Sequence, residues 1–244
     1  MVDANSNANA SEFDSSWSRK YRSGDEDVIV RSDSFRHYSD ILASLCPSGD
    51  RRIDVLDVGC GTGRHFHRLR NVRRLVGIDL SPHMIEQARQ PVRASEVTVE
   101  SVELIAGDVF SAPLADGSFD LVYSIGVYGE YAPFDDALLQ RLCRLMRPGG
   151  RLFITAVDSA SRVSEPENAT PSLPRRAVRK LFPLLPARLR RALNRRLSPH
   201  YASRAQVEAV LGRSGLDGIE VTAYPHVSGW RGVHFDCLAI RPLD

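Results

Sequence analysis

Apolar and polar residues follow two periods along the middle of this chain. Short apolar runs bounded by polar or glycine-rich stretches are typical of strands, and apolar residues that recur at helical spacing are typical of an amphipathic helix. Apolar runs cover residues 55–58, 74–79, 102–106, 119–124 and 151–157. Leucines recur at helical spacing over residues 135–146, and Arg147-Pro148-Gly149-Gly150 ends that pattern. Strands that alternate with helices predict a mostly parallel sheet.

The pattern changes toward the end of the chain. Ser203 and Gln206 form the capping box expected at a helix start, and this helix should extend to about Leu211. Residues 218–224 and 233–240 follow as two runs of strand character with no helical pattern between them. Strands that are joined directly pair antiparallel, so we expect a terminal hairpin.

Residues 55–63 (Val-Leu-Asp-Val-Gly-Cys-Gly-Thr-Gly) carry the strongest chemical signal. Gly59, Gly61 and Gly63 alternate after an extended run, and Phe66 and Leu69 then indicate one side of a helix. A strand, a tight glycine turn and a helix start let a ligand approach the backbone closely. The N–H groups of such a helix start favour a carboxylate or phosphate. The alternative is a generic glycine-rich turn in another nucleotide-binding fold.

Two acidic residues narrow the choice of ligand. Dinucleotide sites have Gly-x-Gly-x-x-Gly, whereas this chain has Gly-x-Gly-x-Gly preceded by Asp57. Asp57 would repel a pyrophosphate but would bind the ammonium group of an amino acid, directly or through water. Asp79 ends the next predicted strand, where an acid suits ribose hydroxyls, and Ser81 then starts a helix. The pattern indicates a nucleoside with an amino-acid tail and no phosphate.

These segments resemble two motifs of the class I S-adenosylmethionine-dependent methyltransferases. Residues 55–63 are similar to motif I, and Gly77-Ile78-Asp79-Leu80-Ser81-Pro82-x-Met84 is similar to the second motif. The order of signals over residues 50–158 also resembles that family, in particular small-molecule enzymes of the methyltransferase domain 11 and 25 types. The resemblance implies an α/β, Rossmann-like fold with a seven-stranded mostly parallel sheet, a C-terminal antiparallel hairpin and helices on both faces. It implies S-adenosyl-L-methionine as cofactor and S-adenosyl-L-homocysteine as product.

The resemblance also implies which residues bind the cofactor. Leu80 and Met84 would border the adenine, Asp108 would accept a hydrogen bond from its amino group, and the Val109 backbone would face the ring. The backbone near Ser124 would hold the amino end of the cofactor. The complete predicted set is Tyr21, Asp57, Gly59, Cys60, Gly61, Gly63, Asp79, Leu80, Met84, Asp108, Val109 and Ser124.

The domain organisation predicted from composition and pattern has five parts. They are a disordered tail (1–12), a helical arm or cap (13–50), a cofactor-binding core (51–158), a basic amphipathic insert or lid (159–202), and a helix with a hairpin that completes the core (203–244).

Three regions should form the methyl-acceptor pocket, because ligands of such sheets lie beyond the carboxyl ends of the strands. In the arm, Tyr21 would face the sulfonium, where a ring stabilises a cation, or would only pack the arm to the core. The loop 124–131 and the basic insert are the other two regions. Neither region identifies a catalytic base, and each candidate has a structural alternative. The candidates are Tyr128, Glu130, Tyr131, His200, His226 and His234.

Positive charge is concentrated in one part of the chain. The formal net charge is +2, yet residues 168–207 contain ten Lys or Arg residues and no Asp or Glu. Leu189, Leu193 and Leu197 recur every four residues there, which is typical of an amphipathic helix with basic flanks. Four interpretations stay open: a lid with a solvated charged face, a site for an anionic acceptor, a contact with a membrane surface, and nucleic-acid binding, for which no recognition module is present.

Composition excludes several classes of protein. No apolar run approaches the ~20 residues of a membrane span, and nothing near the N-terminus resembles a secretory signal. We therefore expect a cytoplasmic protein. The four cysteines, Cys46, Cys60, Cys143 and Cys237, lack the spacing of metal ligands, so we expect reduced thiols and no metal.

The function predicted from the sequence is transfer of a methyl group from S-adenosylmethionine to a small-molecule acceptor, with oxygen favoured, by in-line substitution. The acceptor would be anionic or amphiphilic. The alternatives are an RNA or protein methyltransferase that uses the basic residues 168–207, and a non-catalytic partner protein that binds the cofactor.

Overall fold

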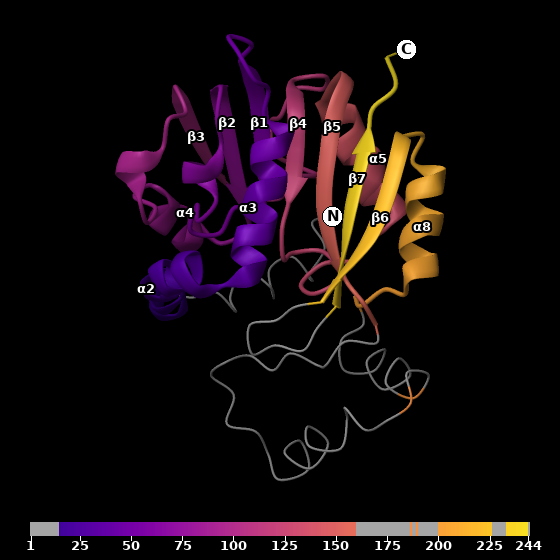
Figure 1. Ribbon diagram of the computed structural model, residues 1–244, viewed down its shortest axis with the longest axis horizontal. Helices are drawn as coiled ribbons and strands as arrows, with labels where there is room; N and C mark the ends of the chain where they lie inside the picture. Colours follow the sequence, from indigo (N-terminus) through magenta and orange to yellow (C-terminus); the bar gives the residue numbers. More distant parts are fainter. Residues whose placement is uncertain (1–14, 160–185, 187–188, 190–199, 226–232, 244) are drawn as a thin grey trace.

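The computed structural model describes residues 15–159, 186, 189, 200–225 and 233–243 (Figure 1). Its centre is a seven-stranded sheet in the order β3-β2-β1-β4-β5-β7-β6. The strands are β1 (Ile53–Val58), β2 (Val72–Asp79), β3 (Ser101–Ala106), β4 (Phe119–Ser124), β5 (Met146–Val157), β6 (Asp217–Pro225) and β7 (Val233–Ile240). Strands β1 to β5 pair in parallel, and β7 pairs antiparallel with both β5 and β6. The predicted fold class and terminal hairpin are confirmed.

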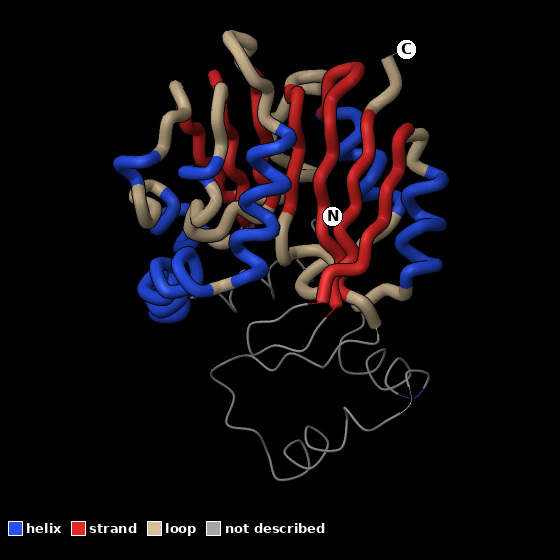
Figure 2. The backbone as a smooth tube through the Cα atoms, viewed as in Figure 1, coloured by secondary structure: helices blue, strands red, loops and turns tan. Residues whose placement is uncertain are grey.

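Helices cover both faces of this sheet (Figure 2). Two helices precede β1, namely α2 (Ser15–Arg31) and α3 (Asp33–Leu45), and α3 lies on one face with α4 (Pro82–Ala88). The other face packs against α5 (Asp136–Leu145) and α8 (Arg204–Arg213). The core therefore has two buried layers, with Leu42 and Phe153 in the first and Leu142 and Val207 in the second.

The helix starts follow the predicted capping chemistry. The Ser81 side chain accepts from the Met84 N–H, and Pro82 occupies the first turn of α4. Ser203 and Gln206 form both bonds of the predicted capping box at the start of α8. These local signals were sufficient to place the helices because each cap satisfies backbone donors within its own turn.

The prediction of a helix directly after the glycine turn is wrong. Only a 3-10 turn, η1 (Phe66–Arg68), follows Gly63, and the chain enters β2 a few residues later. Gly63 has a left-handed φ of 72°, and a Cβ atom there would lie 2.7 Å from the Phe66 ring. The chain thus folds back too tightly for an α-helix. The predicted row of free N–H groups at a helix start is absent from this turn.

The Pro-Gly-Gly segment also differs from the prediction, because β5 begins at Met146 rather than at Arg151. The Gly149 N–H donates to the Arg241 carbonyl, and the Arg241 N–H donates to the Gly150 carbonyl. Pairing with the residues that follow β7 extends the strand through the turn. The register between β4 and β5 shifts there, between Phe119 and Leu121.

Candidate functional site

Strands β1 and β2 bring two acidic side chains to one edge of the sheet. In the parallel register Asp57 pairs with Gly77, so Asp79 ends β2 beside the end of β1. Asp57 is buried and accepts a 2.7 Å hydrogen bond from the Tyr123 hydroxyl of β4. The two Asp79 oxygens accept from the N–H groups of Gly61 and Ser81, each at 2.9 Å. The carboxylate therefore connects the glycine turn to the start of α4.

Burial controls the charge of this pair. It raises the pKa of Asp57 to about 8; the Tyr123 hydrogen bond opposes that rise, and the nearby Asp79 charge adds to it. Burial also raises the pKa of Asp79, against the two backbone N–H groups that favour its charged form. No Lys, Arg or His among the described residues forms an ion pair with either carboxylate. The site suits a ligand with a cation and hydroxyl groups, and it disfavours a pyrophosphate.

The glycine turn is open on one side only. The N–H groups of Gly59 and Cys60 donate to the Ile78 carbonyl at 2.7 and 3.0 Å, which ties the turn to β2. A Cβ atom on Gly59 would lie 2.3 Å from the Val127 side chain, whereas a Cβ atom on Gly61 would meet nothing within 4 Å. A ligand can therefore approach the backbone at Gly61, beside the Asp79 carboxylate.

The residues predicted to surround the adenine follow β2 and β3. Leu80 is exposed, Met84 is buried, and Val109 is buried in the core of the sheet. One Asp108 oxygen accepts from the Phe110 N–H at 3.0 Å. Phe110 itself is half-exposed and was not in the predicted set. The roles of these residues toward a nucleoside remain predictions.

The remaining predicted cofactor residues lie around the ends of β1 and β4. Cys60 is buried, and burial raises the pKa of its thiol well above its ordinary value. Ser124 is fully buried and donates its hydroxyl to the Val58 carbonyl at 2.6 Å. This bond holds the ends of β1 and β4 together. Their roles toward a cofactor also remain predictions.

A buried ion pair fixes α2 to the glycine turn. Asp25 is fully buried in α2 and accepts from the Thr62 hydroxyl and from Arg64 Nε, both at 2.6 Å. The Arg64 guanidinium lies 4.5 Å above the Tyr21 ring, and Tyr21 stacks on Trp17. This contact places Tyr21 beside the turn. Asp25 was not predicted, because an acid in a polar helix gives no sequence signal for a partner 37 residues away.

The loop after β4 carries three of the predicted catalytic candidates. Tyr128 is buried, and burial raises the pKa of its hydroxyl, with the charges of Asp108 and Asp135 adding to the rise. Tyr128 therefore keeps its proton at neutral pH and is a poor base. Glu130 is partly buried and Tyr131 exposed on the same loop.

The histidine candidates lie in different surroundings. Burial lowers the pKa of His200, which lines a hollow of about 370 Å³ with Phe134 and residues of α8. His234 is buried on β7, with its Nδ1 atom 3.0 Å from the Tyr38 hydroxyl. His226, and nearly all of the basic residues 168–207, lie outside the described residues.

A pair of His and Asp side chains was missed by the sequence analysis. His37 Nε2 of α3 lies 2.6 Å from Asp236 Oδ2 of β7, and the His37 ring stacks on Tyr224 with centroids 3.8 Å apart. The two partners are 199 residues apart. Neither residue belongs to a motif, so only the tertiary structure brings them together.

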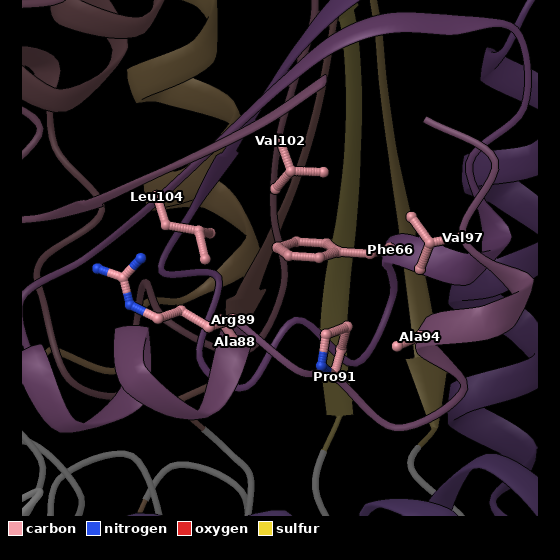
Figure 3. Close-up of a pocket in the computed structure, with 8 residues that line it drawn as sticks. All are labelled: Phe66, Ala88, Arg89, Pro91, Ala94, Val97, Val102 and Leu104. Atoms are coloured by element: carbon pink, nitrogen blue, oxygen red, sulfur yellow. The ribbon is translucent and has the colours of Figure 1, made fainter. Parts of the chain in front are cut away.

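A separate hollow of about 340 Å³ lies beside α4 (Figure 3). Phe66 of η1 forms one wall, facing Val102 and Leu104 of β3, and Ala88, Arg89, Pro91, Ala94 and Val97 complete its lining. Asp57 and Asp79 do not line it, so it is distinct from the acidic site. The described residues contain no cluster of three or more potential metal ligands and no helix able to span a membrane, and all four cysteines are free.

Comparison with known proteins identifies relatives of the chain. A family model described as a methyltransferase domain matches residues 50–184. The chain is 39% identical over 119 residues to malonyl-[acyl-carrier protein] O-methyltransferase of Hahella chejuensis, a match that covers 48% of this chain and 40% of that protein. It is 34% identical over 117 residues to an O-methyltransferase of Aspergillus sclerotiorum, covering 46% and 43%. The matches thus span less than half of these relatives.

A similar fold occurs in a solved structure. Phosphoethanolamine N-methyltransferase 2 of Haemonchus contortus, in complex with S-adenosyl-L-methionine, is 16% identical with a TM-score of 0.65; the match covers 99% of this chain and 60% of that one. At this identity the likeness concerns the fold alone.

Replacement of Asp57 by Asn should change how stability depends on pH. The folded pKa of about 8 lies above the ordinary value of 3.8, so the folded state holds a proton between those values that the unfolded state has lost. Wild-type stability therefore falls as pH rises from about 4 to 8, by on the order of 1.4 kcal/mol for each pH unit, and is level above that. Urea unfolding should show Asp57→Asn gaining stability over wild type across this range.

Asp40→Asn provides the control for loss of a carboxylate, because it removes a solvent-exposed acid and leaves the pair of Asp57 and Asp79 unchanged. A difference between Asp57→Asn and wild type that stays constant with pH would show that Asp57 is ionised in the folded protein at neutral pH.

Replacement of Asp25 by Asn should loosen α2 from the glycine turn. It leaves the mostly buried Arg64 cation without its carboxylate, and breaking such a pair costs up to about 3–5 kcal/mol. Asp27→Asn removes a solvent-exposed ion pair with Arg31 on the same helix and should cost less than about 1 kcal/mol. Equal losses in urea unfolding would contradict the role assigned to Asp25.

Proposed function

The chain belongs to the methyltransferase domain family, and we propose that it transfers a methyl group from S-adenosylmethionine to an oxygen atom of a small-molecule acceptor. One observation carries this proposal: the buried carboxyl group of Asp57 and the partly buried one of Asp79, neither with a cationic partner among the described residues, lie beside the open backbone of Gly61. The ammonium and ribose hydroxyls of the cofactor match this charge and hydrogen-bonding capacity. Relatives named as O-methyltransferases support oxygen as the acceptor atom.

Each part of the site has a proposed role in holding the cofactor. Asp79 still has lone pairs that can accept from two ribose hydroxyls after its bonds to Gly61 and Ser81. Burial raises the pKa of Asp57 to about 8 in the protein alone, and an ammonium group bound beside it, directly or through water, would lower that pKa and pair with the carboxylate. Around the adenine we assign Leu80, Met84, Asp108 and Val109, and near the amino end Ser124.

When bound, the cofactor supplies a methyl group on a sulfonium, which is already an activated leaving group. The protein must therefore align the acceptor with the methyl group and exclude water. Such alignment can lower the barrier by about 7–11 kcal/mol. We assign this task to the loop after β4 and to the arm of α2 and α3, which Asp25 holds against the glycine turn.

We favour a small acceptor over a nucleic acid because relatives of the chain include a probable tocopherol O-methyltransferase. The features that favoured RNA were the basic residues 168–207, most of which lie outside the described residues. An anionic or amphiphilic acceptor that these residues bind remains part of the proposal. The RNA or protein enzyme and the non-catalytic binding protein remain as outcomes of the test.

The decisive experiment is incubation of the purified protein with methyl-labelled S-adenosylmethionine and a native metabolite extract, followed by mass spectrometry. We expect a labelled small molecule with the methyl group on oxygen. Label in added RNA or protein would show that the methyl acceptor is a macromolecule and not a small molecule. Binding of S-adenosylhomocysteine with no labelled product from any source would favour the non-catalytic role.

Asp79→Ala should weaken binding of S-adenosylhomocysteine by about 10–100-fold, because a hydrogen bond to a charged group contributes about 1.5–3 kcal/mol. Isothermal titration calorimetry measures this directly. Glu103→Ala removes an exposed acid from β3 and should leave the affinity unchanged. Unchanged affinity in Asp79→Ala, or saturable binding of a pyridine dinucleotide by wild type, would argue against the ribose site.

Gly59 and Gly61 provide a matched pair, because both have a positive φ and only their surroundings differ. Gly59→Ala should lower the melting temperature, since its Cβ atom meets Val127 at 2.3 Å and overpacking costs about 1–3 kcal/mol. Gly61→Ala should be destabilised less than Gly59→Ala. Its affinity for S-adenosylhomocysteine should fall at least about tenfold, because its methyl group enters the space proposed for the ligand. Unaltered affinity in Gly61→Ala would place the ligand elsewhere.

A further inference from the structure

The pair of His37 and Asp236 joins α3 of the arm to β7, which is an interior strand of the sheet. Asp236 is 5% exposed, and one of its oxygens lies 2.6 Å from His37 Nε2. Its other oxygen, Oδ1, is buried and has no hydrogen-bond partner among the residues that the structure describes. The His37 side chain is 31% exposed, so this ring has one nitrogen on the carboxylate and is partly open to solvent. A buried carboxylate with an unused oxygen is costly, which argues that the pair has a purpose beyond packing.

The surroundings hold the His37 ring in one orientation. Its face stacks on Tyr224 of β6, and the edge of Tyr38 contacts it with ring centroids 5.2 Å apart. Tyr38 is fixed in turn by its hydrogen bond with His234. A histidine that is oriented by a carboxylate and two rings is preorganised to accept a proton at its remaining nitrogen.

The sheet register places this pair on the same face as Asp57. Asp57 pairs with Tyr123, Tyr123 with Phe153, and Phe153 with Leu238. Asp236 lies two residues from Leu238 along β7, toward the edge at which β1 and β4 end. Three strand spacings and two residues separate Asp236 from Asp57, about 14 Å across the sheet and about 7 Å toward that edge. A cofactor tail and a small acceptor fit within this span.

The loop after β4 lies between the two groups. The backbone of Asp236 pairs with Thr155 of β5, and the Thr155 hydroxyl accepts from the Gly126 N–H at 2.9 Å. The next residue, Val127, packs on Gly59 of the glycine turn. A continuous row of contacts therefore leads from the cofactor turn to the histidine pair. The N-terminal end of α3, which carries His37, lies at this same edge (Figure 1).

We propose that His37 accepts the proton of the acceptor hydroxyl during methyl transfer and that Asp236 is its positioning residue; this inference rests on the proposed function. Nε2–H donates to Asp236, which leaves the lone pair of Nδ1 for the acceptor. The acceptor oxygen bonds to the methyl carbon as the carbon–sulfur bond breaks and sulfur keeps the electron pair. The acceptor proton passes to Nδ1. The imidazolium is paired with Asp236 and later releases its proton to solvent.

Other titratable groups near the pair do not compete for this role. Burial raises the pKa of Tyr38 and of Tyr224, so both hydroxyls keep their protons at neutral pH. Burial also raises the pKa of Asp236, and its bond with His37 opposes that rise. Among the described residues, Asp33 and Arg36 of α3 and His234 of β7 are the other charged or titratable groups near the pair. Of the groups named here, only His37 combines a carboxylate partner with a partly exposed ring.

The test compares His37→Gln with wild type in the labelling assay with S-adenosylmethionine and metabolite extract. We expect labelled product to form at least about 100-fold more slowly, because general-base catalysis usually contributes a factor of that size. The affinity for S-adenosylhomocysteine should change less than about twofold. His83→Gln, an exposed histidine on α4, is the matched control and should keep the wild-type rate. Added imidazole should partly restore the rate of His37→Ala, which a packing role would not allow.

The variant Asp236→Asn distinguishes a role of Asp236 in positioning His37 from a role in packing alone. It should lower the rate and move the acidic limb of the pH–rate profile to lower pH, because a neutral amide no longer stabilises the imidazolium. Labelled product at the wild-type rate from His37→Gln would overturn this proposal while leaving the proposed function intact. Absence of labelled product from the wild-type protein would overturn the proposed function, and the role of His37 with it.

Discussion

The carboxyl groups of Asp57 and Asp79, which have no Lys, Arg or His partner among the described residues, are the constraint on which the rest of the site depends. Burying a carboxylate without a cation opposes folding, and burial raises the pKa of both groups, which lie at the ends of neighbouring strands. In the described part of the chain, hydrogen bonds from Tyr123, Gly61 and Ser81 offset this cost rather than a lysine or arginine. A cationic ligand bound beside them would lower these pKa values and so favour the charged carboxylates. A protein cation in the same place would stabilise the fold but would remove the attraction on which the proposed cofactor binding rests.

The arm compensates for the missing helix after the glycine turn. In place of a helix start, the turn has only η1, and the side chains of Thr62 and Arg64 bind Asp25 of α2 instead. The turn is therefore held from outside, by a segment that precedes it in the chain. This arrangement ties the arm to the proposed cofactor site, because Asp25 of α2 binds Thr62 and Arg64 of the turn.

The sequence predicted most of the fold because its signals are local. Caps at Ser81 and Ser203, the leucine pattern of α5 and the runs of the central strands each lie within one element. Prediction failed where distant segments decide the structure. After the glycine turn the chain folds back at Gly63 against Phe66 instead of continuing as a helix, and β5 is lengthened by pairing near Arg241. His37 and Asp236 could not be found from sequence, because no pattern relates residues in the first helices to the last strand.

The position of β7 affects the order in which the protein can assemble. This strand is the last one described in the chain, yet it inserts between β5 and β6 and carries the partner of His37. The arm emerges before β7 during synthesis, but α3 must wait for β7 before its contact with that strand can form. Contacts so distant in sequence close large loops and form slowly. The side of the sheet that carries the pair of His37 and Asp236 is thus completed late, after the half that carries Asp57 and Asp79.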